Sequence, residues 1–232
     1  MALKDTKLVI FDMDGLLLDT ERLIVEHWDR FALRQGLDRD RIREVCMASI
    51  GINLPAVRRL VSEKLGPDFP YEAYSERVKE SIAEELKGGP MPVKKGAFEL
   101  LEYLKSIRMP AVVASSSPRA AVTAELRDAG LLPYFAAVFG GEDAARSKPA
   151  PDLFLRAASS IGADPAACLV FEDSHNGIRA ASAAGMMSIM VPDLQPADRE
   201  MQTLYTARAE DLATAAEMLR QVFSPGAGAL NG

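Results

Sequence analysis

The sequence is poor in residues that mark several common classes of protein. Its two cysteines, Cys46 and Cys168, stand far apart, so neither a disulfide framework nor a zinc site with paired cysteines is indicated. We expect both to be small residues of the core. No run of about 18 uncharged apolar residues occurs, which excludes a membrane-spanning helix.

Positive charge is also scarce. The chain has 27 Lys and Arg against 33 Asp and Glu, a formal net charge of −6, and no basic run. This balance argues against a nucleic-acid partner, although it allows a local positive pocket for a small anion. Asp12 and Asp14 interrupt the apolar stretch near the N-terminus, so no signal-peptide pattern is present and we expect a cytoplasmic protein.

What the chain does have is the composition of an ordinary globular protein. Of its 232 residues, 48% are hydrophobic and 26% are charged. A chain of this length can bury a large core, either as one domain or as a domain with an insert.

Short apolar runs and helical patterns alternate from Met91 onward. Ser117, Pro118 and Gly130 are typical of a helix cap, first turn and stop, as are Ser174 and Gly185 for a later helix. A further helix is predicted over 151–161, and Gly162 closes it. Together with the N-terminal run, five strands are predicted, at residues 8–11, 111–114, 136–139, 168–171 and 187–191. Strands alternating with helices predict an α/β fold, a Rossmann-like doubly wound parallel sheet with helices on both faces.

Residues 20–87 have a different pattern, in which apolar side chains recur at helical spacing and no strand is evident. We expect this segment to form an all-helical insert, and residues 1–19 and 88–232 to form the α/β core domain. The two crossings between them are candidate hinges. The tail, 224–232, is rich in Gly and Ala, and we expect it to be disordered. The recurring positions are Leu23, His27, Trp28 and Phe31, then Val57, Leu60, Val61 and Leu65.

Acids, hydroxyls and one amine follow the predicted strands. The carboxyl ends of parallel strands share one edge of a sheet, where ligands bind. Alone, each group has a simpler explanation, such as an Asx-turn, a helix cap, a surface lysine or acids in a first helical turn. Their arrival at one edge in this order favours an active site. In chain order the groups are Asp12 and Asp14, Ser115 and Ser116, Lys148, and Glu172 and Asp173.

These residue types favour phosphoryl transfer. Asp12, Asp173 and Glu172 offer hard oxygen ligands of the kind that Mg²⁺ prefers. The two serines precede a helix whose free amides suit a phosphate group, and Lys148 adds a compact positive charge. The cation and the lysine would neutralise charge that otherwise repels an attacking carboxylate.

The motifs resemble those of the haloacid dehalogenase superfamily, most of whose members are phosphatases. Residues 11–15 are similar to its first motif, Ser115 to its second, 147–149 to its third and 172–174 to its fourth. The helical insert resembles the C1-type cap of the family. In detail the chain is similar to the β-phosphoglucomutase-like branch, which includes sugar-phosphate phosphatases.

The resemblance implies a role for each motif residue. Asp12 would be the nucleophile that forms an aspartyl-phosphate. Asp14 would be the general acid and then the general base, which distinguishes phosphatases from the dehalogenases that lack this acid. Mg²⁺ would be held by Asp12, Glu172, Asp173 and the backbone oxygen of Asp14. The phosphoryl group would be held by Ser115, Ser116 and Lys148.

Two departures from the β-phosphoglucomutase pattern bear on the reaction. The histidine that gates the catalytic acid of that mutase falls on Ile24, and the arginine for its second phosphate falls on Leu54. Because this chain lacks both the gating histidine and the phosphate-binding arginine, hydrolysis is favoured over phosphate transfer within the substrate. We identify Glu21, Asn53 and Lys79 as the cap residues that contact substrate, the last by loose alignment.

We therefore expect a Mg²⁺-dependent phosphomonoesterase that acts on a small phosphorylated metabolite, such as a sugar or polyol phosphate. A phosphomutase and a non-catalytic binding protein with the same fold are the alternatives. His27 is expected to be a packed helix residue near Trp28, and His175 a surface residue at a helix start. Arg58 and Arg59 face either substrate or solvent, and the oligomeric state is left open.

Overall fold

The molecule is built on a six-stranded, wholly parallel sheet. In the computed structural model, which describes residues 2–223, the strand order is β3-β2-β1-β4-β5-β6. The predicted parallel sheet is confirmed, and β6 is an additional strand whose two residues are too short to give a sequence signal. The prediction for 224–232 lies outside the described residues. The strands are β1 Leu8–Phe11, β2 Ala111–Ala114, β3 Ala137–Phe139, β4 Cys168–Glu172, β5 Met187–Met190 and β6 Ala207–Arg208.

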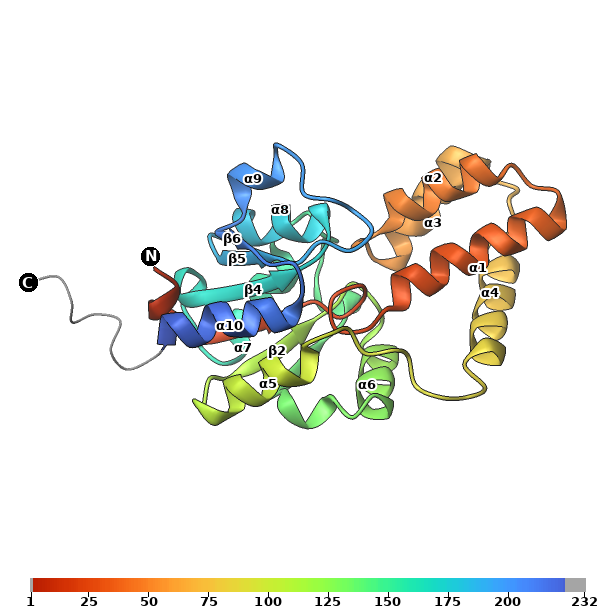
Figure 1. The fold of residues 1–232 in the computed structure, drawn as a ribbon. Helices are drawn as coiled ribbons and strands as arrows, with labels where there is room; N and C mark the ends of the chain where they lie inside the picture. The colour runs from red at the N-terminus through yellow and green to blue at the C-terminus, as the bar shows by residue number, and fades with distance from the viewer. Residues whose placement is uncertain (1, 224–232) are drawn as a thin grey trace, which may run out of the picture.

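Helices cover both faces of this sheet (Figure 1). Side chains of α5, α6 and α10 pack on one face, and those of α7 and α8 on the other. The helices of this part are α5 Ala97–Ser106, α6 Arg119–Asp128, α7 Asp152–Ser160, α8 His175–Ala183, α9 Met201–Leu204 and α10 Leu212–Phe223. Short 3-10 turns occur at Leu3–Asp5, Leu132–Tyr134, Gly141–Asp143 and Pro165–Ala167.

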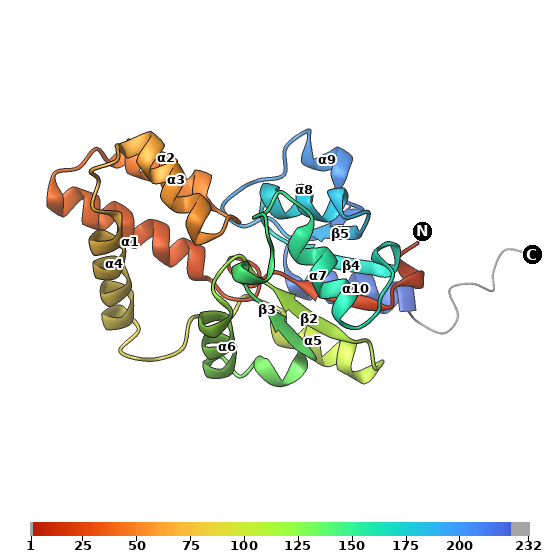
Figure 2. The same cartoon turned by 180° about the vertical axis from the view of Figure 1, so that it is seen from behind.

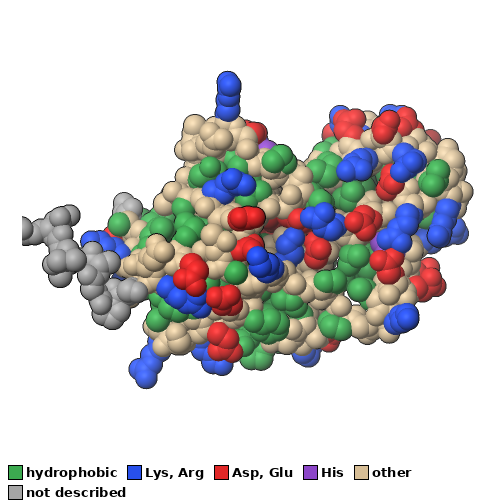
Figure 3. Space-filling model, viewed as in Figure 1, with side chains coloured by type: hydrophobic (Ala, Val, Ile, Leu, Met, Phe, Trp, Pro, Cys, Tyr) green, Lys and Arg blue, Asp and Glu red, His purple; other side chains and the backbone are tan. Residues whose placement is uncertain are grey.

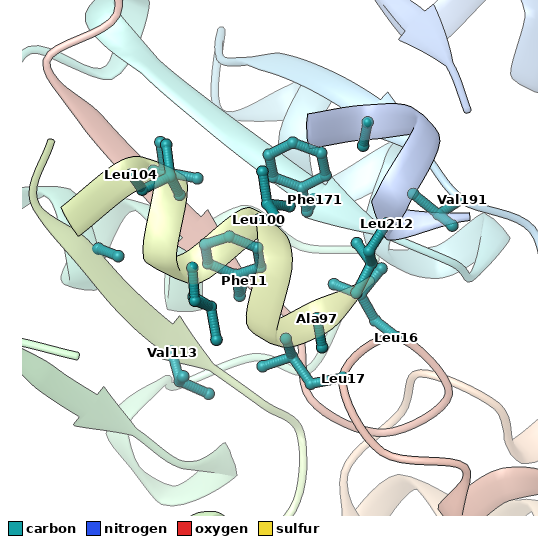
Figure 4. Packing of buried hydrophobic residues seen from close by; sticks show 14 of the residues in the cluster. Phe11, Leu16, Leu17, Ala97, Leu100, Leu104, Val113, Phe171, Val191 and Leu212 are labelled. Atoms are coloured by element: carbon teal, nitrogen blue, oxygen red, sulfur yellow. The ribbon is translucent and has the colours of Figure 1, made fainter. Parts of the chain in front are cut away.

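The central strand β1 is buried on both sides. Val9 and Phe11 face the α5 and α10 layer, and Leu8 and Ile10 face the α7 and α8 layer. This is why the strand is an unbroken apolar run rather than an alternating one. The ring of Phe11 stacks on that of Phe171 in β4, with centroids 5.1 Å apart, beneath α5 and α10 (Figure 4). This packing fixes the register of the two strands that carry the acidic motifs.

The chain reverses its direction across the sheet between β1 and β4. It runs outward from β1 to β3, and then returns to place β4 on the other side of β1. Ligands of open parallel sheets bind at such a reversal point, beyond the carboxyl ends of the strands. Phe11 and Phe171 are paired in register there, so the residues that follow them lie together.

Four helices form a separate layer beside the sheet (Figures 1 and 2). No strand occurs between residues 20 and 87, all of which the structure describes, and this segment forms four helices. Its apolar cluster includes Trp28, which stacks on Tyr71 with ring centroids 6.1 Å apart. The four helices are α1 Thr20–Gln35, α2 Arg39–Ser49, α3 Leu54–Leu65 and α4 Tyr71–Glu85.

The two chain crossings to this insert run side by side. The N–H of Asp19 donates to Pro92 O at 2.8 Å, and the N–H of Lys94 donates to Leu17 O at 2.9 Å. Leu18 also bridges to Val93. Both crossings are thus tied at one place, which is where a hinge would act.

Most of the predicted helix ends are correct to within a residue. Ser174 accepts a hydrogen bond from Gly177 N and caps α8, and Gly130 and Gly162 adopt the left-handed conformation after α6 and α7. The start of α6 was wrong by one residue, because Pro118 occupies the cap position. Ser117 does not cap α6, because its hydroxyl donates a hydrogen bond to Asp14 instead.

On the face shown in Figure 3, acidic and basic side chains are interspersed over both the sheet layer and the helical insert. Within residues 2–223, no helix combines the length and the apolar character needed to span a bilayer.

Candidate active site

The centre of the site is an ion cluster at the ends of β1 and β4. Lys148 is 1% exposed, and its Nζ donates to Asp12 Oδ1 at 2.5 Å and to Glu172 Oε1 at 2.8 Å. A third bond goes to Ala114 O at 3.2 Å, and the ammonium lies 4.6 Å from the ring centroid of Phe154. Lys148 is therefore part of a buried ion cluster and is not a solvated surface lysine.

The electrostatics of this cluster are dominated by burial. Loss of water raises the pKa of Asp12 to about 7; Lys148 lowers this value, and Glu172 and Asp14 raise it further. Burial alone would lower the pKa of Lys148, but Asp12 and Glu172 outweigh it and hold that pKa above its usual range. The lysine therefore stays charged, and Asp12 needs more positive charge nearby to be a full carboxylate at neutral pH.

Asp14 lies at the same edge with both oxygens engaged. Its Oδ1 accepts from Thr20 Oγ1 at 2.8 Å, and its Oδ2 accepts from Ser115 Oγ at 3.0 Å and Ser117 Oγ at 2.8 Å. Ser115 also accepts from the N–H of Ser117 at 3.0 Å. The bonds from Thr20 and Ser117 were missed by sequence reasoning, because they join residues whose separation carries no periodic signal.

Two further carboxylates converge on Gly15. A Cβ at that position would collide with the carboxylate of Asp173 and with Glu21 Oε2, and Gly15 has φ of +81°. Asp173 Oδ1 and Glu21 Oε2 are buried with no hydrogen-bond partner in the described part of the chain. Burial raises the pKa of both groups well above the ordinary range; Glu21 adds to this for Asp173, and Asp14 and Asp12 add to it for Glu21.

This arrangement fits a divalent cation. Unpartnered carboxylate oxygens beside a second buried carboxylate are costly unless a cation compensates them. Within residues 2–223, no three His, Cys, Asp or Glu side chains are grouped to hold a metal by themselves. Mg²⁺ requires only one or two carboxylates, since waters complete its shell, so Asp12 and Asp173 suffice.

Glu172 is engaged elsewhere. Its Oε1 accepts from Lys148, and its Oε2 accepts from both the N–H and the hydroxyl of Ser174 at 2.8 Å. A Cβ at Gly177 would collide with the same carboxylate. The structure therefore places Glu172 as the partner that orients Lys148, and its role as a metal ligand stays a prediction.

At the start of α6, some of the groups expected to bind phosphate already have hydrogen-bond partners within the protein. Ser116 lines the cavity described below, and its hydroxyl donates to Gly51 O of the insert at 2.8 Å. The first amide of α6, that of Arg119, donates to Glu142 at 3.0 Å. Glu142 was not foreseen from the sequence, and it removes one of the amides expected to face a phosphate.

A cavity of about 590 Å³ lies between the insert and the sheet edge, and Asp12, Asp14 and Asp173 form part of its wall. The insert contributes a mostly apolar wall with a few polar groups. Glu21 and Lys79 line it, whereas Asn53 does not; the side chain of Asn53 caps α3 by accepting from Ala56 N at 3.2 Å. The insert's polar lining residues are Thr20, Glu21, Ser49, Tyr71, Ser75 and Lys79.

The remaining candidates lie away from this cavity. His27 is buried in the insert, where Nδ1 is 2.9 Å from Ser81 Oγ, and burial followed by Arg30 lowers its pKa. His175 is at the start of α8, partly exposed. Arg58 pairs with Glu72 at 2.6 Å on the surface. None of these side chains lines the cavity wall formed by the described residues.

Both cysteines are buried core residues, as expected. Burial raises the pKa of Cys46 to about 12 and that of Cys168 to about 11. Neither thiol is activated.

Comparison with known proteins agrees with the geometry. Residues 6–185 match the family model of the haloacid dehalogenase-like hydrolases. The chain is 34% identical over 192 residues to the fructose-1-phosphate phosphatase YqaB of Escherichia coli K12, covering 79% of this chain and 95% of that protein. It is 32% identical over 183 residues to a phosphorylated carbohydrates phosphatase of Thermotoga maritima, covering 78% and 82%.

A solved structure extends the match of fold to almost the whole chain. The β-phosphoglucomutase of Clostridium difficile superposes with a TM-score of 0.73, covering 94% of this chain and 96% of that one, at 21% identity. The chain belongs to the haloacid dehalogenase-like hydrolase family. It is an enzyme of the phosphatase type, and members of this family generally use a divalent metal ion.

Proposed function

We propose that this protein is a Mg²⁺-dependent phosphomonoesterase of the cytoplasm that hydrolyses a small phosphorylated metabolite, a sugar or polyol phosphate, through an aspartyl-phosphate. The observation that carries the proposal is the contact of Lys148 with both Asp12 and Glu172, next to a cavity whose wall includes Asp12 and Asp14. Relatives that act on fructose 1-phosphate and on phosphorylated carbohydrates support the class of substrate.

Asp12 is the nucleophile in this proposal. Lys148 holds its Oδ1, so the attack on phosphorus is assigned to Oδ2. A bond forms from Oδ2 to phosphorus, the ester bond to the leaving oxygen breaks, and Asp14 donates a proton to that oxygen. Ser115, Ser116 and Lys148 bind the phosphoryl oxygens during this step.

Hydrolysis of the intermediate regenerates the enzyme. Asp14, now a carboxylate held by Thr20 and Ser115, accepts a proton from water as that water attacks phosphorus. The bond from phosphorus to Asp12 Oδ2 breaks, which releases inorganic phosphate and the free Asp12 carboxylate. Asp12, Asp173 and the backbone oxygen of Asp14 would hold Mg²⁺, which would supply positive charge to neutralise the phosphoryl oxygens and Asp12. Glu172 supports Lys148, as its hydrogen bonds with Lys148 and Ser174 require, and would contribute to the ion only if it moved.

We assign the helical insert, residues 20–87, as the cap domain, and 1–19 with 88–232 as the core domain. The cap excludes bulk water and large substrates when it lies over the site. Glu21 and Lys79, which line the cavity, are its proposed substrate contacts; Asn53, whose side chain caps α3, would contact substrate only after the cap rearranges. The two crossings tied at Asp19 and Lys94 are the hinge.

Hydrolysis is favoured over a mutase reaction by the cavity wall. Ile24 and Leu54 both line the cavity, at the positions where a mutase would have its gating histidine and its phosphate-binding arginine. No arginine lines the cavity among residues 2–223, and Lys79 is the one basic residue of that wall. A second phosphate would therefore have little positive charge to bind.

The test is release of inorganic phosphate from a panel of phosphorylated metabolites, with Mg²⁺ and with a chelator. The wild type should release phosphate stoichiometrically with Mg²⁺ and without a bisphosphate activator, and Asp12→Asn should release none. Unchanged turnover in Asp12→Asn would remove Asp12 from the mechanism, and dependence on a bisphosphate would indicate a mutase.

A further inference from the structure

One carboxylate in the cavity wall has no role in the mechanism above. Glu125 lies on α6 in the sheet layer, and its Oε2 is buried with no hydrogen-bond partner among the described residues. A buried carboxylate oxygen without a partner costs free energy. A ligand that donates a hydrogen bond would remove that cost.

The position of Glu125 relative to the phosphate site follows from the helix. Ser117, Ala121 and Glu125 are spaced by four residues and all line the cavity, so one stripe of α6 and the turn before it forms a continuous wall. The stripe begins beside Ser116 and Ser117 and ends at Glu125, roughly 10 Å further along the helix axis.

The surroundings of Glu125 favour a neutral, hydroxyl-bearing group over an anion. Asp14 and Asp128 are the acids whose charges reach it, and both act, after burial itself, to raise its pKa to about 7. The insert wall opposite is mostly apolar. A second phosphate placed here would meet like charge, whereas a hydroxyl would meet an acceptor.

We propose that Glu125 is a specificity-determining residue that accepts hydrogen bonds from the hydroxyl groups of the substrate body, at the end opposite the phosphate, and rejects a second phosphate. The substrate class is then the monophosphate ester of a linear polyol or open-chain sugar of about five or six carbons, the length that spans from the start of α6 to Glu125. This inference rests on the phosphatase function proposed above.

The experiment compares three variants on four substrates. Glu125→Leu removes the acceptor, Glu125→Gln removes only the charge, and Asp128→Asn is the control, an exposed acid on the same helix that does not line the cavity. The substrates are phenyl phosphate, glycerol 3-phosphate, a six-carbon alditol monophosphate and the corresponding bisphosphate.

Glu125→Leu should raise KM for the six-carbon monophosphate about ten-fold or more, with kcat within about three-fold. KM for phenyl phosphate and glycerol 3-phosphate should not change, because neither substrate reaches Glu125. Glu125→Gln should raise KM for the monophosphate less and lower KM for the bisphosphate, since it removes the repulsion. Asp128→Asn should match the wild type.

An equal rise for phenyl phosphate, or no change for the six-carbon ester, would overturn the proposal. The same pattern in Asp128→Asn would show that negative charge on α6 affects KM from a distance, without contact to the substrate. That result would also overturn the proposal. Calorimetric binding of the alditol monophosphate to Asp12→Asn, with and without Glu125→Leu, separates the two hypotheses. Weaker binding in the double variant supports the Glu125 contact even if the wild type hydrolyses nothing, in which case only the phosphatase function fails.

Discussion

The hydroxyl of Ser147 accepts a hydrogen bond from the main-chain N–H of Asn53, across 2.8 Å. Ser147 directly precedes Lys148, and Asn53 caps α3 of the helical insert. The loop that carries the central lysine of the site is therefore attached to the insert, although 94 positions separate the two residues.

This contact is one of several to the same segment of the insert. The side chain of Asn176 donates to Ile50 O at 3.0 Å, and that of Gln195 donates to Met47 O at 3.0 Å. All of them bind main-chain atoms of residues 47–53. The docking of the insert therefore depends little on which side chains this segment carries.

Ser147→Ala should lower kcat/KM about five-fold, the loss expected for one net hydrogen bond, because the insert would dock less firmly over Lys148. The free energy of unfolding should fall by no more than about 1 kcal/mol, the contribution of the same hydrogen bond. Ser62→Ala, at an exposed position of α3, is the matched control and should behave as the wild type. Steady-state kinetics on the best substrate measures both, and an unaltered kcat/KM in Ser147→Ala would show that this contact does not assist catalysis.

Lys148→Met should abolish phosphate release and destabilise the fold by about 3–5 kcal/mol, since it leaves Asp12 and Glu172 buried without a cation. Adding Glu172→Gln should restore much of the stability and none of the activity. Urea unfolding and phosphate release are the two measurements. A stable Lys148→Met protein would mean that the buried pair does not need this lysine.

Gly15→Ala should cost more stability than Gly36→Ala. Both glycines have positive φ, +81° and +66°, and each change should therefore cost about 1 kcal/mol from backbone strain. At Gly36 nothing lies within 4 Å of the added Cβ, whereas at Gly15 it would collide with Asp173 and Glu21. Gly15→Ala should also lose activity. Equal losses in the free energy of unfolding would count against convergence of the two carboxylates there.

Mg²⁺ should raise the melting temperature of the wild type, because binding of a cation to the folded state alone stabilises that state, by about 2.7 kcal/mol at 100 times Kd. Asp173→Asn should melt higher than the wild type without metal, since a buried carboxylate with a raised pKa opposes folding when ionised. It should also lose the Mg²⁺ effect. Thermal unfolding with a chelator and with Mg²⁺ gives both values, and a retained Mg²⁺ shift would place the ion elsewhere.

Glu125→Gln should gain stability over the wild type as the pH rises. The pKa of Glu125 is raised from 4.5 to about 7 in the folded protein, so the folded state holds this proton more tightly than the unfolded state. Ionisation therefore costs stability, with no cost below about pH 4.5 and the full cost above about pH 7. Unfolding of both proteins at pH 5 and pH 8 tests this, with Glu63→Gln, at an exposed position of α3, as the control. A difference that is independent of pH would contradict the raised pKa.

Much of the fold was predictable because its signals are local. The unbroken apolar run of β1 and the caps at Ser174 and Gly162 depend on residues a few positions apart, and they were located to within a residue. The short strand β6 was missed, because two residues carry no periodicity. The start of α6 was misplaced, because Ser117 bonds to Asp14 rather than to its own helix.

The sequence predicted which residues gather at the candidate site, but not the hydrogen bonds that they make. The motifs indicated that acids, hydroxyls and a lysine meet at one edge, and the structure brings them there. They did not indicate that Ser174 and Lys148 occupy both oxygens of Glu172, or that Glu142 takes the first amide of α6.

The doubly wound sheet, the helical segment 20–87 and the sheet edge with Asp12, Lys148 and Asp173 were all predictable from local patterns. Strand and helix periodicity together with parallel connections leave few other topologies. Which atoms each of these groups contacts follows from the packing of the layers in three dimensions. Lys148 and Asp12 are 136 positions apart, and Glu125 shares the wall of the cavity with residues of the insert that are far from it in the sequence. Such contacts depend on how whole layers pack, and no local pattern of residues encodes that.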